Sequence, residues 1–232
     1  MLKLASAYTT EQSFDSEIGE QKQMFKYMDT GSMGLCEVDC FENKKKIIRR
    51  QITEIVQALD KEYSIRASRE ILENLKDISE CKNANIIFCY VGRENEINTM
   101  PIIQYFLDLG KQVVVPKCVS KGIMEAYLIE SSEDLEEGKY GILEPKIEST
   151  KRVSPDKIDL AIVPCITVNA QGYRLGYGGG FYDRYLLGTE AYRIVLCRER
   201  TLYEDIPVED HDQKMNMVIT ENRIIKTDER IG

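Results

Sequence analysis

The 232-residue chain has no tryptophan, a single histidine (His211), and no Cys-x-x-C pair among its seven cysteines. A Ser-His-Asp or Cys-His centre would therefore depend entirely on His211, and a metal site built from several histidines is excluded. The cysteines are scattered, and several stand within apolar runs typical of strands, so we interpret them as buried free thiols. His211 stands in a polar, acidic segment and is interpreted as a surface loop residue.

Long apolar runs are also absent. No segment approaches the roughly 20 apolar residues that a membrane-spanning helix needs, and the N-terminus lacks the basic and apolar stretches of a secretory signal. We therefore expect a cytoplasmic protein with no membrane partner. The 31 Lys and Arg residues against 39 Asp and Glu residues give a net charge of −8, which argues against a nucleic-acid-binding protein with a large basic face. A local basic cluster could still bind a small phosphate.

The first 42 residues differ from the remainder of the chain. They contain eight acidic residues and three lysines, few branched aliphatic residues, and no sustained apolar period. We interpret residues 1–42 as a loosely ordered acidic extension, with a lid or an oligomer contact as open alternatives. Residues 43–232 are expected to form one domain, as a monomer or a small homo-oligomer.

From Lys44 onward, apolar residues follow helical and strand patterns in alternation. An amphipathic stripe predicts a first helix, and it consists of Ile48, Ile52, Ile55, Val56 and Leu59. Further helices are expected at about 62–78 and 99–109, and strands at 86–91, 112–115 (ended by Pro116), 124–129, 160–163, 193–197 and 217–220. Near-continuous Val and Ile runs joined by helices are typical of a mainly parallel sheet covered on both faces. The predicted fold class is therefore α/β, a three-layer α/β/α domain with Rossmann-like topology.

One glycine-rich segment is the strongest indication of chemistry. It follows the strand predicted at 160–163, has four glycines in five positions, and reads Arg174-Leu175-Gly176-Tyr177-Gly178-Gly179-Gly180-Phe181-Tyr182-Asp183-Arg184. Glycines allow positive φ, and successive N–H groups leading into a helix can bind phosphate oxygens. A P-loop is excluded because no Gly-Lys-Ser/Thr follows, and a dinucleotide fingerprint is excluded because Phe181 replaces its third glycine.

The segment resembles the R-L-G-x-G-x-G-[YF]-Y-D signature of the 5-formyltetrahydrofolate cyclo-ligase family, also called 5,10-methenyltetrahydrofolate synthetases. The resemblance extends over residues 44–225. It includes a Lys-x-x-x-Arg pair near the start of the first helix, the run Glu96-Ile97-Asn98-Thr99, the run Gly141-Ile142-Leu143-Glu144-Pro145, and residues 207–212. Residues 43–232 would then be the catalytic domain, and the acidic extension lies outside the resemblance.

The resemblance implies an enzyme that uses ATP and Mg²⁺ to convert 5-formyltetrahydrofolate into 5,10-methenyltetrahydrofolate, with release of ADP and phosphate. ATP would phosphorylate the formyl oxygen, a folate amine would attack the activated carbon, and phosphate would depart. This chemistry requires positioning and charge neutralisation rather than a covalent protein nucleophile, so no nucleophilic residue is assigned.

By the same resemblance, a run of residues would contact ATP, namely Arg174, Leu175, Gly176, Tyr177, Gly178, Gly179, Gly180, Phe181 and Tyr182. Tyr177, Gly178, Gly179, Gly180 and Phe181 would also border the folate. Some family members have a lysine where this chain has Gly179, so one phosphate cation is missing from the run.

Two Lys-x-x-x-Arg pairs overlap in the basic cluster at the start of the first helix. With Ile48 at 0°, Lys45 and Arg49 fall at about 60° and 100°, whereas Lys46 and Arg50 fall at about 160° and 200°. The first pair therefore leans toward the apolar stripe, and we assign Lys45 and Arg49 to the ATP phosphates.

The folate and metal residues also follow from the resemblance. Glu96 would bind the pterin, with Val91 lining the same pocket at the end of the strand predicted at 86–91. Asp183 and Asp212 would be the Mg²⁺ ligands, since carboxylate oxygens suit Mg²⁺ beside nucleotide phosphates. Without the resemblance, Asp183 could be a helix-start charge and Asp212 a solvated loop acid.

Two other functions remain open at this stage. A non-catalytic α/β protein that binds a phosphorylated metabolite would use the glycine run without the two aspartates. A nucleic-acid-binding protein would use the basic cluster of residues 44–50, but no aromatic residues are interleaved there.

Overall fold

A computed structural model describes residues 37–138 and 141–227, with side chains from residue 42 onward. The prediction for the acidic extension therefore lies almost wholly outside the described residues. The first described helix, α2 (Glu37–Ala58), begins seven residues before Lys44, where the apolar stripe was predicted to start. Within the described residues, no helix is both long enough and apolar enough to span a bilayer.

The described residues from Phe41 onward form one compact unit. Its described part contains a central 8-stranded sheet with the order β12-β11-β10-β7-β1-β2-β3-β6. The strands are β1 (Ile86–Cys89), β2 (Gln112–Ser120), β3 (Ile123–Ile129), β6 (Lys151–Val153), β7 (Leu160–Val163), β10 (Tyr192–Leu196), β11 (Met217–Ile219) and β12 (Ile224–Lys226). Two small antiparallel pairs are added by β4 (Leu135–Glu137) with β5 (Leu143–Pro145), and by β8 (Thr167–Val168) with β9 (Arg174–Leu175).

The strands β11, β10, β7, β1 and β2 pair in parallel, whereas β3, β6 and β12 pair antiparallel at the edges. In chain order, the five parallel strands are arranged 2-1-3-4-5, which is a doubly wound order. The direction of winding reverses between β1 and β7, so the chain leaves the carboxyl ends of these two neighbours on opposite sides. Parallel α/β sheets place their ligands at this kind of position.

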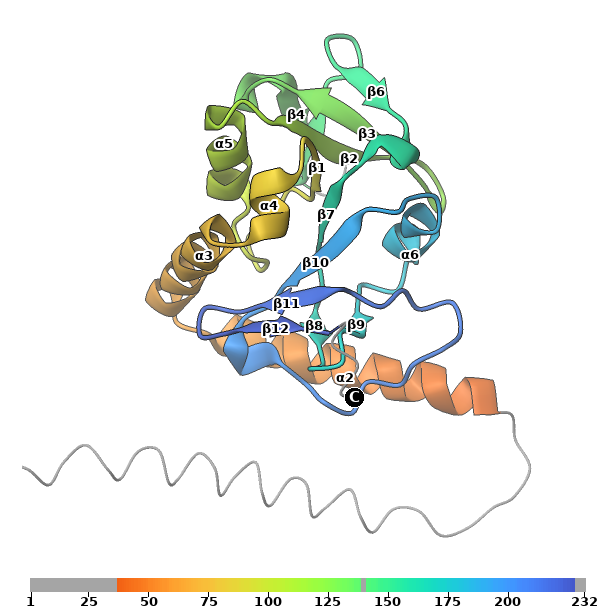
Figure 1. Cartoon of the computed structure of the whole chain (residues 1–232). Helices are drawn as coiled ribbons and strands as arrows, with labels where there is room; N and C mark the ends of the chain where they lie inside the picture. The colour runs from red at the N-terminus through yellow and green to blue at the C-terminus, as the bar shows by residue number, and fades with distance from the viewer. Residues whose placement is uncertain (1–36, 139–140, 228–232) are drawn as a thin grey trace, which may run out of the picture. The chain divides into compact units, whose positions relative to one another are not determined.

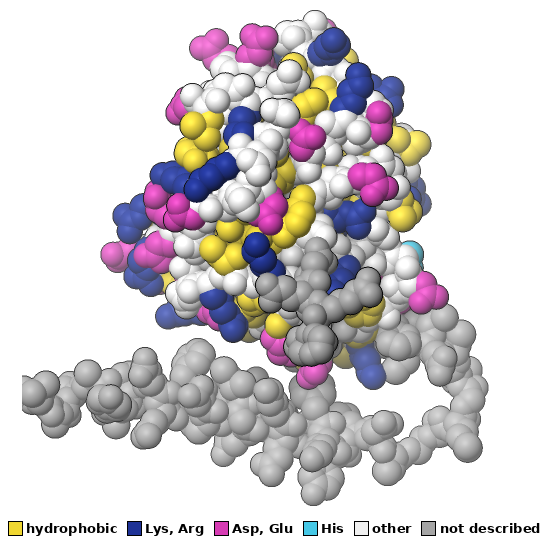
Figure 2. All heavy atoms as spheres, in the orientation of Figure 1, with side chains coloured by type: hydrophobic (Ala, Val, Ile, Leu, Met, Phe, Trp, Pro, Cys, Tyr) yellow, Lys and Arg dark blue, Asp and Glu magenta, His cyan; other side chains and the backbone are white. Residues whose placement is uncertain are grey.

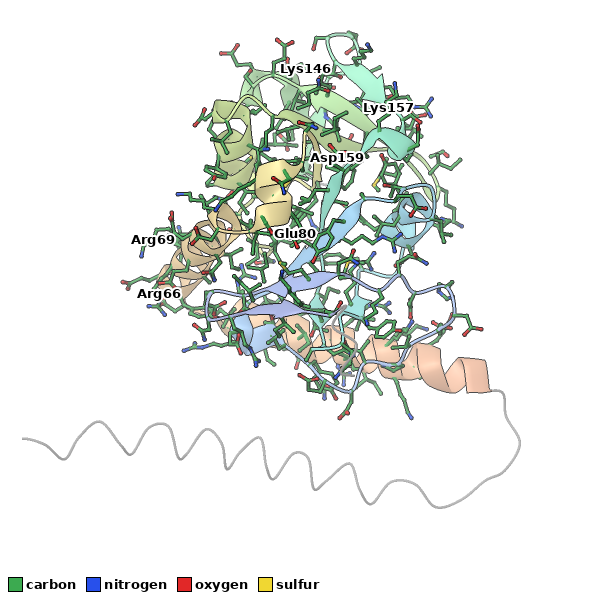
Figure 3. All side chains as sticks on the ribbon, viewed as in Figure 1. Arg66, Arg69, Glu80, Lys146, Lys157 and Asp159 are labelled. Atoms are coloured by element: carbon green, nitrogen blue, oxygen red, sulfur yellow. The ribbon has the colours of Figure 1, made fainter. Side chains whose placement is uncertain are left out.

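Helices cover both faces of the sheet, as Figure 1 shows. On one face lie α3 (Lys61–Lys76), α4 (Ser79–Asn83) and α5 (Met100–Asp108), and on the other lies the short α6 (Phe181–Leu186). Arg66 and Arg69 of α3 project away from the sheet into solvent, as expected for the polar side of an amphipathic helix (Figure 3). The three-layer α/β prediction is therefore confirmed.

The apolar runs that predicted the strands are the centre of the core. Every residue of β7 is buried, and so are three of the four residues of β1. Each such aliphatic side chain stabilises the fold by roughly 1.5–3 kcal/mol. Helix α2 contributes to a separate small cluster, in which Ile48 and Ile52 pack against Leu175 and Ile206.

One strand boundary was predicted wrongly. Pro116 does not end β2, which continues to Ser120 and pairs with β3 throughout, including Pro116 with Ala126. On its other side, β2 pairs with β1 only as far as Val114. Beyond Val114 that side of β2 is an edge of the sheet. Pro116 lacks an N–H group, but no strand on that side would have accepted a hydrogen bond from it.

Candidate active site

A cleft of about 1070 Å³ opens at the carboxyl ends of β1, β2 and β7. Tyr90, Val91 and Pro164 line it where β1 and β7 end, which is the point where the winding of the sheet reverses. Its other walls come from α2, the glycine run with the start of α6, and the loop that contains residues 209–212. Segments far apart in the sequence therefore meet at one position.

The glycine run forms a tight loop between β9 and α6. Gly178 (φ 90°) and Gly180 (φ 61°) adopt left-handed conformations, which L residues with a side chain rarely adopt. Gly180 is also the residue before the first turn of α6. At Gly179, an added Cβ would lie 2.8 Å from Cδ2 of Phe181, so a lysine there would require the ring to shift. The missing lysine therefore agrees with the position of the Phe181 ring in this chain.

Arg174 is the most deeply buried cation of the cleft, with its side chain 4% exposed. Its Nη2 lies 3.1 Å from Oδ1 of Asp183, so the two groups form an ion pair. Neither Nε nor Nη2 has a partner with hydrogen-bond geometry among the described residues. A buried guanidinium with unused donors is costly unless a ligand supplies an acceptor, so Arg174 is prepared for an anion.

The burial of side chains on α2 follows the helical wheel. Lys45 is buried and Arg49 is half-buried, whereas Lys46 and Arg50 are exposed. Lys45 and Arg49 line the cleft, and so does the exposed Lys46. Arg49 donates from Nε to the carbonyl of Gly176 at 2.8 Å, and its Cζ lies 3.4 Å from where a Cβ of Gly178 would be. Burial lowers the pKa of Arg49, which nevertheless stays charged at any physiological pH.

Lys45 connects α2 to the loop near the C-terminus. Its Nζ donates to Oε2 of Glu209 at 2.6 Å and to Oδ2 of Asp212 at 2.7 Å. Burial disfavours the ammonium, but the hydrogen bonds to Asp212 and Glu209 outweigh burial and hold the pKa of Lys45 above its usual value. The ligand atoms of Glu209, His211 and Asp212 all lie within 4.8 Å of one another. His211 is exposed, as the sequence indicated.

Asp183 lies apart from that group of three. It stands in the first turn of α6, pairs with Arg174, and accepts a hydrogen bond from the backbone N–H of Gln213 at 3.3 Å. Since Gln213 follows Asp212 directly, the two aspartates predicted as metal ligands approach the cleft from neighbouring segments, and both line it.

Glu96 is buried beside the end of β1 and is held by arginines from two sides. Its Oε2 accepts hydrogen bonds from the backbone N–H of Arg93 at 2.8 Å and from Arg93 Nε at 3.2 Å. The Arg93 guanidinium also lies over the Tyr177 ring, with Cζ 4.0 Å from the ring centroid. Arg198 donates to the carbonyls of Asn95 and Glu96 at 3.0 and 2.8 Å, and so fixes the loop that carries the carboxylate.

A sequence model of the 5-formyltetrahydrofolate cyclo-ligase family matches residues 41–221. The chain belongs to this family. The protein "Probable 5-formyltetrahydrofolate cyclo-ligase" of Schizosaccharomyces pombe is 27% identical over 199 residues, covering 78% of this chain and 95% of that relative. The 5-formyltetrahydrofolate cyclo-ligase of Escherichia coli K12 is 27% identical over 146 residues, covering 61% of this chain and 80% of the relative.

Solved structures show the same fold. The NMR structure of Aquifex aeolicus 5,10-methenyltetrahydrofolate synthetase superposes with a TM-score of 0.73 at 26% sequence identity, and covers 81% of this chain and 95% of that chain. The cyclo-ligase resemblance and the enzyme class read from the glycine run are therefore confirmed.

All residues predicted for the cyclo-ligase site line the same cleft, from Lys45 and Arg49 through Val91, Glu96 and residues 174–183 to Asp212. The sequence interpretation missed three residues that hold the site together, namely Arg93, Arg198 and Glu209. Arg93 and Glu209 each stand three residues before a predicted site carboxylate, a spacing that suits a turn, and this was the available signal. No local pattern marks Arg198, which acts across 102 positions of sequence.

Proposed function

We propose that this protein converts 5-formyltetrahydrofolate into 5,10-methenyltetrahydrofolate with consumption of ATP and release of ADP and phosphate. One observation carries the nucleotide part of the proposal, which is the unused, buried guanidinium donors of Arg174 beside the glycine loop. Guanidinium donors match phosphate oxygens in number and direction. The family membership supports the folate part.

The nucleotide end of the cleft is defined by its cations and its glycine loop. Arg174, Lys45 and Arg49 supply three positive charges around the loop of residues 174–182. Because Gly178 and Gly180 place the backbone in left-handed conformations, the loop can approach a phosphate closely and offer N–H donors. We therefore assign residues 174–182, with Lys45 and Arg49, to ATP binding.

The folate end lies at Glu96 and Val91. A carboxylate can accept two hydrogen bonds from the amino-pyrimidine edge of a pterin, and Glu96 is buried at the cleft wall, where water competes weakly. Tyr177 and Phe181 belong to the nucleotide loop and line the same cleft as Glu96 and Val91. Residues 177–181 would therefore border both substrates and hold the formyl group near the phosphates.

The carboxylates of the cleft suit Mg²⁺. Asp183 and Asp212 provide hard oxygen ligands, and Mg²⁺ is usually held by one or two carboxylates together with substrate phosphates. Glu209 is a further oxygen donor beside Asp212. When bound, Mg²⁺ would neutralise phosphate charge during phosphoryl transfer. Lys45 pairs with both Glu209 and Asp212, and its positive charge offsets one of their two negative charges and so keeps these acids close together.

The proposed chemistry needs no covalent enzyme intermediate. The terminal phosphoryl group of ATP passes to the formyl oxygen of the folate, and ADP leaves. The folate amine attacks the activated formyl carbon, loses its proton, and expels inorganic phosphate to close the ring. The protein contributes orientation through Glu96 and charge neutralisation through Arg174, Lys45 and Arg49.

The direct test is to incubate the protein with 5-formyltetrahydrofolate, Mg²⁺ and ATP, and to follow methenyltetrahydrofolate by its near-ultraviolet absorbance. ADP should form in equal amount, and omitting ATP should abolish both signals. Binding of both substrates without product would instead favour the alternative of a non-catalytic phosphometabolite-binding protein.

A matched pair of variants tests the role of Arg174. Arg174→Gln removes the unused donors, and we expect turnover to fall by at least about tenfold. Arg152→Gln is the control, since Arg152 lies on β6 with its side chain 63% exposed and paired with Glu125. Circular dichroism and thermal melting establish that both variants are folded. If both keep full turnover, Arg174 is not the phosphate cation.

The visible face of the described residues does not favour a nucleic-acid function. On the face seen in Figure 2, Lys and Arg side chains of the described residues are interspersed with Asp and Glu rather than gathered in one basic patch. Phosphate-backbone binding depends on clustered positive charge.

A further inference from the structure

Two cysteines that the proposed folate chemistry does not use stand side by side. In the pairing of β7 with β10, Val163 is opposite Val195. Cys165 and Cys197 come two residues further along each chain, just past the ends of β7 and β10. Neighbouring strands lie about 4.8 Å apart, within the Cα separation of about 4.4–6.8 Å that a disulfide needs. The strands that lead into the two cysteines are therefore spaced suitably for a disulfide.

The two thiols lie close together. The Cys165 thiol donates to the carbonyl oxygen of Leu196, the residue before Cys197, at 3.4 Å, and it also interacts with the Cys197 thiol. On its other side, Cys197 Sγ lies 3.3 Å from the hydroxyl of Thr201 and 3.5 Å from the carbonyl oxygen of Arg198. The Thr201 hydroxyl, which also lies 3.0 Å from that carbonyl oxygen, can donate to a Cys197 thiolate.

A second cavity gives access to this pair. It has a volume of about 400 Å³, and its walls include Cys165, Cys197 and Arg198. Arg198 is 5% exposed, and its Nε has no hydrogen-bond partner among the described residues. The cavity is large enough for a small uncharged oxidant, and the cation in its wall favours a thiolate.

The two thiols differ in acidity. The Cys165 thiol, together with Thr201 and Arg198, lowers the pKa of Cys197 despite its burial. The Cys197 thiol and burial raise the pKa of Cys165. Because the Arg198 cation also lines the cavity that reaches both thiols, Cys197 is the nucleophile of the pair and Cys165 the resolving thiol.

We propose that Cys165 and Cys197 form a dithiol site that a hydroperoxide oxidises to a disulfide. The Cys197 thiolate attacks one peroxide oxygen, the O–O bond breaks, and hydroxide leaves, so Cys197 becomes a sulfenic acid. Cys165 then attacks the sulfenic sulfur, the S–S bond forms, and the second oxygen leaves as water after taking up the Cys165 proton. Overall, two thiols and one hydrogen peroxide give one disulfide and two waters.

The remaining described cysteines provide internal comparisons. Cys81 and Cys89 are buried, and burial raises the pKa of both thiols. Cys118 is exposed, but burial of its thiol and the nearby Glu144 carboxylate raise its pKa. Exposure alone would make Cys118 the first thiol to be oxidised, whereas thiolate character and a neighbouring thiol favour Cys197.

The test treats the folded full-length protein with one equivalent of hydrogen peroxide, blocks free thiols with N-ethylmaleimide at acidic pH, and maps the peptides by mass spectrometry. We expect a cross-linked peptide pair joining Cys165 to Cys197, lighter by two hydrogen atoms and abolished by dithiothreitol. In Cys165→Ser the disulfide should be lost, and a dimedone-reactive sulfenic acid should accumulate at Cys197. Cys118→Ser is the matched control and should keep the cross-link.

Two results would overturn the proposal. One is oxidation of Cys118 with both Cys165 and Cys197 still alkylated. The other is a Cys165–Cys197 link that forms only after the protein is denatured. Because the linkage is mapped in the unaltered chain, the result does not depend on the folding of any variant or on the proposed folate reaction.

Discussion

Arg49 and Arg50 are neighbours of the same type that lie about 100° apart around α2, and they offer a sharp test of the nucleotide site. Arg49 lines the cleft and binds the carbonyl of Gly176, whereas the Arg50 side chain is 74% exposed, with only a 3.9 Å ion pair to Glu54. Arg49→Ala removes the proposed charge-assisted hydrogen bond to an ATP phosphate, for which about 1.5–3 kcal/mol is typical. At about 1.4 kcal/mol per factor of ten, the Michaelis constant for ATP should rise roughly 10- to 150-fold. Arg50→Ala should change it less than about threefold, because exposed charges are screened.

The assay is steady-state turnover with varied ATP at saturating 5-formyltetrahydrofolate, together with the reverse titration. Arg49→Ala should affect the ATP titration much more than the folate titration, since Glu96 and Val91 lie at the other end of the site. Thermal melting of both variants separates loss of binding from loss of fold. Equal effects of the two substitutions, or a larger effect of Arg50→Ala, would refute the assignment of the inward side of α2 to the phosphates.

Three further predictions follow from other parts of the molecule. Asp183→Asn should lower turnover at limiting Mg²⁺ by about tenfold or more, and excess Mg²⁺ should partly restore it. The asparagine keeps an acceptor for the Gln213 N–H. A variant that melts at a lower temperature but keeps its turnover per folded molecule would contradict a metal role. Burial and the hydrogen bond to Glu221 raise the pKa of Tyr63, so the folded state keeps the phenol proton at a pH where the unfolded chain has lost it. The free energy of unfolding should therefore fall as pH rises above about 10, and it should fall less steeply in Tyr63→Phe. Urea titrations from about pH 8 to 11 measure this slope, and equal slopes would argue against it. Deleting residues 1–36, which lie outside the family match, should leave steady-state kinetics unchanged, and an inactive but folded truncation would assign the extension a role in the site.

The sheet could be predicted because its signal is local. A strand such as β7 is buried along its whole length, so the sequence Leu-Ala-Ile-Val carries the information by itself. The end of β2 could not be predicted in this way. Whether Pro116 interrupts a strand depends on how far the neighbouring strand β1 extends, and that length is a property of the assembled sheet.

The same distinction applies to the site. The inward direction of Lys45 and Arg49 follows from helical geometry once Ile48 and Ile52 are known to be apolar, so it could be predicted. The partners of Lys45 could not be predicted, because Glu209 and Asp212 are 164 and 167 positions away in sequence. The unused donors of Arg174 could not be predicted either, since the sequence shows an arginine but not which of its nitrogens form hydrogen bonds.

The hydrogen bonds of Lys45 join the beginning of the described chain to its end. Because Glu209 and Asp212 come 164 and 167 positions after Lys45, a growing polypeptide cannot complete these contacts until both acids have been synthesised. Before then, Lys45 on α2 has neither of these carboxylates as a partner. The proposed phosphate site would consequently require the chain to be intact from α2 to Asp212, since a chain cut before Glu209 would retain the glycine loop and yet lack the groups that hold Lys45 in place.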